Sequence, residues 1–323
     1  MTGPRRWWWW FLGPPATGCG PGPVVEIDAG KDYVCARFER GDTACHNYDA
    51  AGGPDQWEDS WEWPSLDTPD ARLTAISTQY VHLCGLDENG GVQCSGRKEF
   101  YDPVPAGRFS AVTAGSYSTC ALDEAGHARC WGTSFYDSSK EFYNGSDLEP
   151  PPGPFRQLLD HDNGYCGLRP EGTLTCWGNN YYGPASPPDE VVFSDVFPSG
   201  SQVYCGLTAG GSSLCWGHAD QAPNYQIVLS GLSPYHRASL GKEAACVLRD
   251  GGEVSCASLP GQDPLEYRPP AGVSFLQITA GFRFFCGLTD KPVDGHRVLC
   301  WGCRWDDEGV DPALPGQCVP PPW

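Results

Sequence analysis

The sequence lacks any long hydrophobic run, because no stretch of eighteen consecutive apolar residues occurs among its 323 residues. A membrane-spanning helix needs about 20 such residues, so no such helix is predicted. Basic side chains are also scarce: 21 Lys and Arg face 40 Asp and Glu, which gives a net charge of −19. A field of this sign repels phosphate backbones, which argues against nucleic acid as a partner.

Turn-forming residues and cysteines, in contrast, are abundant. The chain holds 41 Gly, 31 Pro and 17 Cys. Glycine and proline in these amounts predict many turns and few long helices. The cysteine content does not suit a reducing cytosol unless the thiols bind metal.

The cysteines repeat with a fixed spacing. Six pairs are separated by ten residues, and a seventh pair is the same unit with four residues inserted: Cys35 and Cys45, Cys84 and Cys94, Cys120 and Cys130, Cys166 and Cys176, Cys205 and Cys215, Cys246 and Cys256, Cys286 and Cys300. The first members of these pairs lie 36 to 49 residues apart. A period of about 40–45 residues is typical of propeller blades.

Other residues keep the same register and explain the spacing. If Cys120 and Cys130 face each other across a hairpin, residues 124–126 form a three-residue loop that ends in Gly126. Such a loop needs a residue with positive φ at its last position, which glycine provides. Six of the seven units have this glycine: Gly41, Gly90, Gly126, Gly172, Gly211 and Gly252.

Each unit is too small to bury its own apolar face, so neighbouring units must stack. The prediction is a single all-β domain over residues 24–323, a seven-bladed β-propeller with four strands and one disulfide per blade. We expect the chain to start on an inner strand. We also expect the segment from Cys303 to Cys318 to clasp the last blade.

Two segments carry a family resemblance, VTAGSYSTCALDEAGHARCWG (112–132) and CGLRPEGTLTCWGNNYYG (166–183). They resemble repeats of the regulator of chromosome condensation family, whose Trp-Gly step stands here at Trp131, Trp177, Trp216 and Trp301. Units one, two and six depart from the pattern at this step. The resemblance covers nearly all of the chain after residue 24 and implies the propeller fold.

For function, the resemblance implies recognition through loops. The nuclear founder of the family is a nucleotide exchanger for a small GTPase and docks on chromatin; an acidic, exported, disulfide-bearing relative is expected to do neither. Closer in style are two extracellular branches: the propeller of crinkly-type plant receptor kinases, and a secreted bacterial propeller that inhibits β-lactamases. The disulfide-bearing bacterial branch is the one we favour.

The spacing favours disulfides over metal, since ten residues across a hairpin suit a bridge and a zinc site requires closer clusters. One Cys-x-x-Cys step exists, from Cys300 to Cys303, and leaves zinc or redox chemistry open there. The register pairs Cys300 with Cys286, so Cys303 is expected to pair with Cys318. Cys19 then has no cysteine partner.

Cys19 follows a basic pair and a short apolar run, an order that resembles a bacterial lipoprotein signal. We therefore expect residues 1–18 to be a signal peptide, and residues 19–23 to be a lipidated Cys19 with a short tether. The protein would then be exported, either on the cell envelope or secreted, with membrane contact only through the lipid. Ala16 stands where a leucine is preferred, and a mis-started leader or a free thiol is the alternative.

Catalytic and cofactor motifs are missing from the sequence. The seven histidines share no register within the repeat, and no nucleophile elbow, phosphate loop or paired-histidine metal motif occurs. Residues 160–164 resemble a calcium loop faintly, but an Asx turn explains them better. We expect no enzyme activity, no cofactor and no metal.

The loops after the second cysteines carry aromatic side chains beside acidic ones, which is typical of binding surfaces. These loops should emerge on one face of the ring. The candidate binding residues are Trp57, Trp61, Trp63, Phe100, Tyr101, Phe135, Tyr136, Tyr181, Tyr182 and Trp305. The alternative is that the rings fill gaps between blades, and it stays open for the phenylalanines and tyrosines.

We therefore expect a monomeric recognition or scaffold module that binds a protein, or a glycan, at the cell surface. One alternative is a propeller lyase or hydrolase that uses the central channel. Another is a purely structural protein of the envelope.

Overall fold

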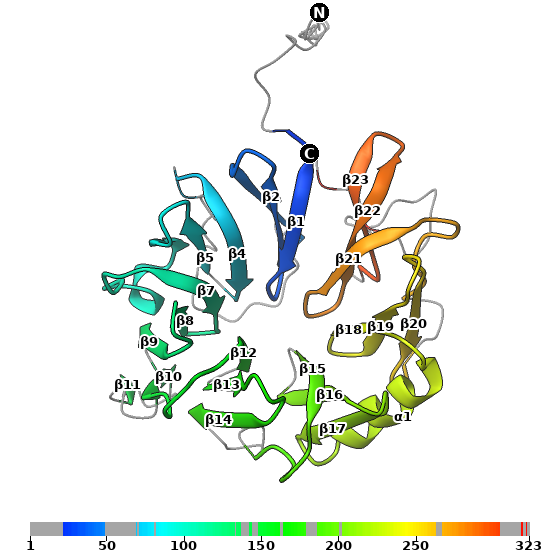
Figure 1. Ribbon diagram of the computed structural model, residues 1–323. Coiled ribbons are helices and arrows are strands. Elements are labelled where there is room, and N and C mark those ends of the chain that lie inside the picture. Colours follow the sequence, from blue (N-terminus) through cyan, green and yellow to red (C-terminus); the bar gives the residue numbers. More distant parts are fainter. Residues whose placement is uncertain are drawn as a thin grey trace, which may run out of the picture.

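Seven β-sheets form a ring in the computed structural model of the protein (Figure 1). The structure describes residues 22–48, 69, 71–80, 82–132, 134–136, 142–143, 148–161, 164–178, 186–199, 202–262, 267–303, 318 and 321. The predicted leader, Cys19 and residues 20–21 of the tether lie outside these residues. No helix in the described part of the chain is long and apolar enough to cross a membrane.

Each sheet, or blade, holds three consecutive antiparallel strands. The bounds of blades 1 to 4 are β1 (Val24–Ala29), β2 (Tyr33–Phe38) and β3 (Thr43–Asn47); β4 (Leu73–Gln79), β5 (His82–Asp87) and β6 (Val92–Gly96); β7 (Phe109–Ala114), β8 (Ser118–Asp123) and β9 (Ala128–Gly132); β12 (Gln157–His161), β13 (Gly164–Leu168) and β14 (Leu174–Gly178). Blades 5 to 7 are β15 (Phe193–Pro198), β16 (Val203–Thr208) and β17 (Ser213–Gly217); β18 (Arg237–Leu240), β19 (Ala244–Leu248) and β20 (Val254–Ser258); β21 (Phe275–Ala280), β22 (Phe285–Val293) and β23 (His296–Trp301).

The prediction of four strands per blade is wrong for the described residues, because every blade sheet there has three. The chain after the third strand takes other forms. It contains the 3₁₀ helix η1 (Lys98–Phe100), the separate pair β10 (Ser134–Tyr136) and β11 (Phe142–Tyr143), and the helix α1 (Ala222–Leu232).

Helix α1 lies against the outer edge of blade 5. The Gln226 side chain pairs with the open edge of β17, because its Oε1 accepts the Cys215 amide at 2.9 Å and its Nε2 donates to the Ser213 carbonyl at 2.8 Å. These are the two kinds of backbone group that a fourth strand would have paired. The helix therefore satisfies an edge that would otherwise be open to another chain.

The predicted hairpin register is confirmed. Cys120 pairs with Cys130 and Leu122 with Ala128, which leaves a three-residue loop closed by a hydrogen bond from the Gly126 amide to the Asp123 carbonyl. Gly126 has a φ of 81°, and the equivalent glycines of the other five units have φ values between 77° and 91°. Glycine is needed at this position because other residues adopt positive φ only with strain.

The eight predicted disulfides are present. Seven join β-strands within a blade, with Cα–Cα distances of 3.9 to 4.1 Å. The eighth joins Cys303 to Cys318, so the Cys-x-x-Cys step at 300–303 is divided between two bridges. Eight bridges indicate an oxidising compartment.

The hydrophobic core is divided among the seven interfaces between neighbouring blades. The Trp-Gly tryptophans are part of this core. Trp177, for example, is stacked on Phe155 of its own blade and on Tyr165, with ring centroids 5.7 and 6.1 Å apart. Stacking of units, as predicted, is what buries their apolar faces.

The ring closes by packing blade 1 on blade 7. Ile27 and Phe38 of blade 1 share a core cluster with Phe284 and with both cysteines of the tail bridge, Cys303 and Cys318. Within the described residues, neither sheet takes a strand from the other. The tail bridge therefore lies at the seam of the ring, as expected for a clasp.

Candidate functional site

Equivalent ends of the blades gather on one face of the ring. Each blade has consecutive antiparallel strands, so the turn after its first strand and the end of its third strand lie on the same side. Backbone hydrogen bonds join the turns of three blades, from Lys242 N to Phe282 O and from Phe282 N to Lys31 O. We call this side the turn face. The loops that follow the third strands start from it.

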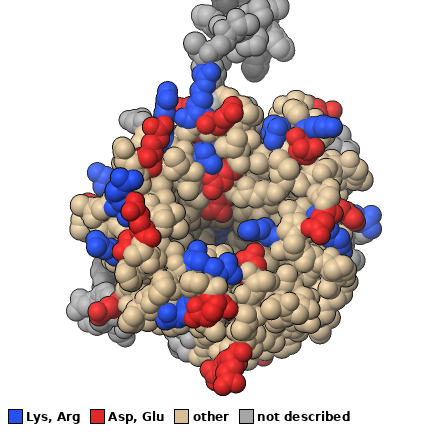
Figure 2. Space-filling model, viewed as in Figure 1, with Lys and Arg blue, Asp and Glu red and all other residues tan. Residues whose placement is uncertain are grey.

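The first strands of the seven blades surround a central cavity of about 490 Å³. Figure 2 shows the hollow at the centre of the disc, with acidic and basic side chains at its rim. A volume in this range would hold a small ligand or an inserted side chain. At the turn face, the lining residues include Lys31, Tyr80 and Phe282.

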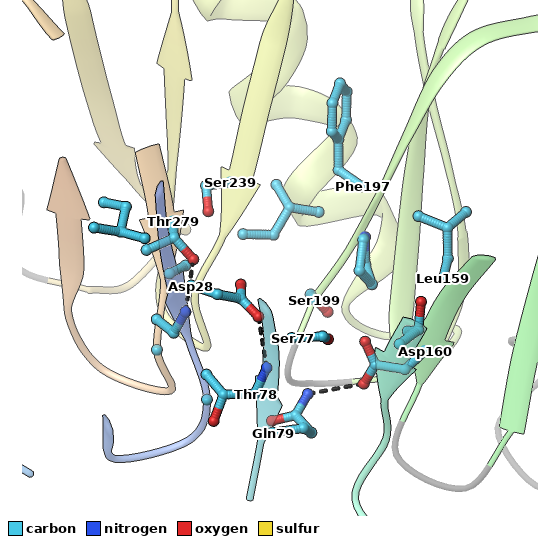
Figure 3. A pocket seen from close by; sticks show the side chains of 18 of the residues that line it. Asp28, Ser77, Thr78, Gln79, Leu159, Asp160, Phe197, Ser199, Ser239 and Thr279 are labelled. Atoms are coloured by element: carbon cyan, nitrogen blue, oxygen red, sulfur yellow. Dashed lines mark hydrogen bonds between the residues drawn. The ribbon is translucent and has the colours of Figure 1, made fainter. Parts of the chain in front are cut away.

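One residue of each first strand stands opposite the first cysteine of its blade. These seven residues, which we call the middle ring, are Asp28, Ser77, Thr113, Leu159, Phe197, Ser239 and Thr279. Blades 6, 7, 1, 2 and 3 contribute a hydroxyl or a carboxyl, and blades 4 and 5 contribute Leu159 and Phe197 (Figure 3). The middle ring thus has a polar part and an apolar part.

The polar members of the middle ring join neighbouring blades. Thr279 Oγ1 accepts the Ala29 amide at 3.1 Å, Asp28 Oδ2 accepts the Thr78 amide at 2.7 Å, and Ser77 Oγ accepts the Ala114 amide at 3.0 Å. In each case the donor directly follows the middle-ring position of the next blade. These bonds run from blade 7 through blades 1 and 2 to blade 3, so this part of the ring has a structural role.

Asp28 is the one acid of the middle ring. Burial raises the pKa of its carboxyl to about 8, and the charges of Glu26 and Asp160 also raise it, against the opposing hydrogen bond from Thr78. The carboxyl is therefore largely protonated at neutral pH. A perturbed acid in a cavity is a common mark of a functional site, but here its bond to the next blade already explains its presence.

Asp160, the first residue of the faint calcium motif, takes part in a protein contact. Its Oδ2 accepts the side-chain amide of Gln79 at 2.8 Å, which joins blade 4 to blade 2 across the cavity (Figure 3). No cluster of three or more metal-ligating side chains occurs among the residues that the structure describes. Asp162 and Asn163 of the motif lie outside them.

His82 is buried between blades 2 and 3, with its Nε2 3.0 Å from Thr119 Oγ1. Burial lowers its pKa to about 4, so the imidazole is neutral over the physiological range. It is not among the residues that line the cavity. We therefore assign it to packing.

The prediction that Phe100 and Tyr101 form a binding surface is wrong, because both side chains are buried, 7% and 8% exposed. They fill the gap between blades 2 and 3, where the Tyr101 carbonyl accepts the Trp131 indole N–H at 2.7 Å. The gap-filling alternative therefore holds for these two residues.

The other aromatic candidates are not placed by the structure. Phe135 and Tyr136 lie in strand β10, and their side chains are outside the described residues. Trp57, Trp61, Trp63, Tyr181, Tyr182 and Trp305 are also outside them.

Three aromatic residues on the turn face, Tyr80, Tyr117 and Phe282, were missed by the sequence reasoning. Tyr80 and Tyr117 are half-buried in the turns of blades 2 and 3, with ring centroids 5.9 Å apart. The middle ring was missed as well, although it lies seven residues before the first cysteine in six of the seven blades. The constant spacing of seven residues before the first cysteine would have identified the middle ring from the sequence.

No protein-family profile matches the chain, and no curated protein matches its sequence. Solved structures are similar to it in fold. The ectodomain of the receptor kinase CR4 from Physcomitrella patens aligns with a TM-score of 0.61 and 21% identity, over 85% of this chain and 72% of that one. The CRINKLY WD40 ectodomain of the Arabidopsis thaliana receptor kinase ACR4 gives 0.60 and 19%, over 91% and 97%.

A third similar structure is yeast RCC1 (Prp20) bound to Kap60, with a TM-score of 0.56 and 12% identity, over 92% of this chain and 86% of that one. At these identities the likeness establishes the fold alone. The fold that these structures share with this chain is the β-propeller, and the resemblance to the regulator of chromosome condensation family remains a prediction. The bacterial branch remains a prediction.

Proposed function

We propose that the protein is an exported binding module that holds a protein partner on its turn face. The observation that carries the proposal is the gathering of first-strand turns and third-strand ends on that one face, around a cavity mouth lined by Tyr80 and Phe282. Aromatic side chains that are half-buried around a depression are favourable anchors for a partner. The loops with the remaining aromatic candidates start from the same face.

Two further observations support this function. Eight disulfides favour a protein that works outside the reducing cytosol. Proteins of similar fold include receptor ectodomains and a yeast protein bound to Kap60. We extend the proposal to a bacterial surface protein that is lipidated at Cys19, which rests on the N-terminal sequence alone.

Affinity capture tests the proposal. The oxidised chain and a variant with Trp57, Trp61, Trp63, Tyr136, Tyr182 and Trp305 changed to alanine are each incubated with envelope extract and culture fluid of the source. Phe100 and Tyr101 are left unchanged because they are buried. We expect a partner that the parent retains and the folded variant loses.

A matched control variant changes exposed apolar residues away from the turn face, Val192, Ile227 and Leu276, to alanine. It should capture the partner as well as the parent does. Equal capture by the aromatic variant would contradict the proposed surface and direct attention to the cavity. Retention of glycans in place of proteins would replace the protein partner with a carbohydrate.

A further inference from the structure

Two of the five lysines in the chain lie against Phe282, which lines the cavity at the turn face together with one of them, Lys31. The Lys31 ammonium lies 5.5 Å from the centroid of the Phe282 ring and 4.7 Å from that of Tyr80, and the Lys242 ammonium lies 4.6 Å from the same Phe282 ring. These residues come from blades 1, 2, 6 and 7. The Arg283 guanidinium carbon also lies 6.0 Å from the Phe282 centroid. Three cations are thus held near one aromatic ring in a chain with a net charge of −19.

The backbone fixes this arrangement. The amide of Lys242 donates to Phe282 O, and the amide of Phe282 donates to Lys31 O, each at 2.8 Å. A glycine precedes each of the three residues, and two of these glycines lie close to a neighbouring blade: a Cβ on Gly30 would lie 3.1 Å from Gln79 Cα, and one on Gly241 would lie 3.0 Å from Phe285 Cζ. The lysines therefore stand on turns that are tied to each other.

The acidic neighbours in the same turns do not neutralise the lysines. Asp32 is buried, and the Glu243 carboxylate accepts the Tyr267 hydroxyl at 3.3 Å. Among the described residues, neither Lys31 nor Lys242 is in an ion pair with a carboxylate. Like charges gathered near one ring repel each other, and a bound anion would relieve that repulsion.

We propose that this mouth is an anion site, in which Lys31 and Lys242 together bind a carboxylate of an acidic polypeptide. A glycan would need open aromatic faces on which to stack, whereas ammonium groups already lie over the Tyr80 and Phe282 rings. A carboxylate needs only the two cations. The cavity beneath them is lined by Glu26, Asp28 and Asp160, so the carboxylate would be held at the mouth and not inside the cavity.

Fluorescence anisotropy with a labelled hexaglutamate peptide tests the site, with hexaglutamine as the uncharged control. We expect the oxidised chain to bind hexaglutamate and not hexaglutamine, more weakly as salt rises. The double variant Lys31→Gln and Lys242→Gln should raise the Kd at least about tenfold, and the variant with arginine at both positions should retain binding. Lys291→Gln, an exposed lysine on the opposite hairpin, should leave the Kd unchanged.

Three results would overturn the inference: no binding of hexaglutamate up to about 1 mM, equal affinity of the double variant and Lys291→Gln, or equal binding of hexaglutamine. Tighter lysine-dependent binding of an oligogalacturonate of the same charge would assign the site to acidic glycans instead. Unfolding curves of each variant separate loss of binding from loss of fold.

The inference deepens the proposed function, since both use the turn face. Their failures are distinguishable. If the lysine variants still capture the partner from envelope extract while hexaglutamate does not bind, the anion site is wrong and the aromatic loop surface stands.

Discussion

At the scale of single residues, the middle-ring position joins neighbouring blades in one part of the ring by accepting a backbone hydrogen bond. Thr279, Asp28 and Ser77 each accept a backbone N–H of the next blade. Only Asp28 does so with a group that can ionise, and its pKa of about 8 makes that contact depend on pH.

The first prediction concerns this carboxyl. Between its ordinary pKa of 3.8 and about 8, the native state holds a proton that the unfolded state releases, so stability falls as pH rises through this window. Asp28→Asn keeps an oxygen for the Thr78 amide and removes the ionisation. We expect the variant to be more stable than the parent at pH 8, on the order of 2 kcal/mol, and to show a smaller loss between pH 5 and pH 8.

Urea unfolding at the two pH values measures this effect. Asp189→Asn is the matched control, because Asp189 is exposed and its change should leave the pH dependence as in the parent. An unchanged slope in Asp28→Asn would show that the carboxyl is already ionised in the folded protein.

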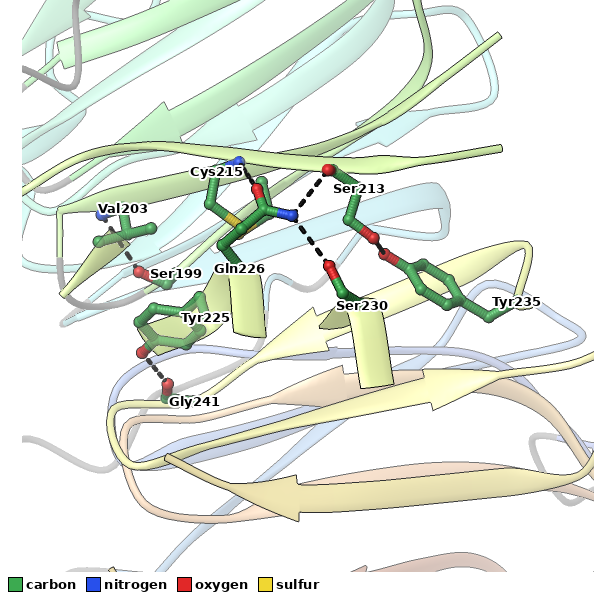
Figure 4. Close-up of a disulfide and its surroundings, with 10 residues drawn as sticks. Ser199, Val203, Ser213, Cys215, Tyr225, Gln226, Ser230, Tyr235 and Gly241 are labelled. Atoms are coloured by element: carbon green, nitrogen blue, oxygen red, sulfur yellow. Dashed lines mark hydrogen bonds between the residues drawn. A yellow bond between two sulfur atoms is a disulfide. The ribbon is translucent and has the colours of Figure 1, made fainter. Parts of the chain in front are cut away.

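At the scale of elements, two glutamine side chains form hydrogen bonds to the backbone of a strand that a neighbouring strand would otherwise form. Gln226 of α1 pairs with the backbone of β17 (Figure 4). Gln277 of β21 pairs with both the N–H and the carbonyl of Ile27 in β1, at 3.0 and 2.6 Å. A side-chain amide offers one donor and one acceptor, which matches the edge of a strand.

The second prediction tests the helix contact. Gln226→Ala leaves the Cys215 amide and the Ser213 carbonyl without these partners, and we expect a loss of about 1–2 kcal/mol in the free energy of unfolding. Ile227→Ala, on the exposed side of the same helix, should change stability by less than about 0.5 kcal/mol. Equal effects of the two variants would mean that α1 acts through its buried apolar residues alone.

At the scale of the whole molecule, the cysteine spacing predicted most of the fold. A bridge across a hairpin fixes both strand register and loop length, so the glycines of positive φ, such as Gly126 and Gly172, followed directly. The number of strands per blade did not follow, because the linkers carry no repeated signal and one of them folds into α1. Burial of Phe100 and Tyr101 also could not be predicted, since an aromatic ring in a loop suits a partner and a gap equally well.

The third prediction concerns the seam of the ring. Changing Cys303 and Cys318 to serine removes the tail bridge, whose loss should cost about 2–4 kcal/mol of stability. The loss should be localised: we expect faster amide hydrogen exchange in blades 1 and 7, which share a core cluster with the bridge. The matched variant without the Cys205–Cys215 bridge should instead affect blade 5, and uniform acceleration in both variants would contradict a clasp.

The contact between blade 1 and blade 7 also determines when the ring can close during folding. Ile27 and Gln277 are 250 residues apart, so the apolar side of blade 1 remains uncovered from its synthesis until nearly the entire chain has been made. During that interval it is available to other unfinished chains, and contacts of such long range form slowly. A truncated chain that ends before β21 cannot cover this apolar side at all. We therefore expect truncated chains to aggregate more readily than the closed ring.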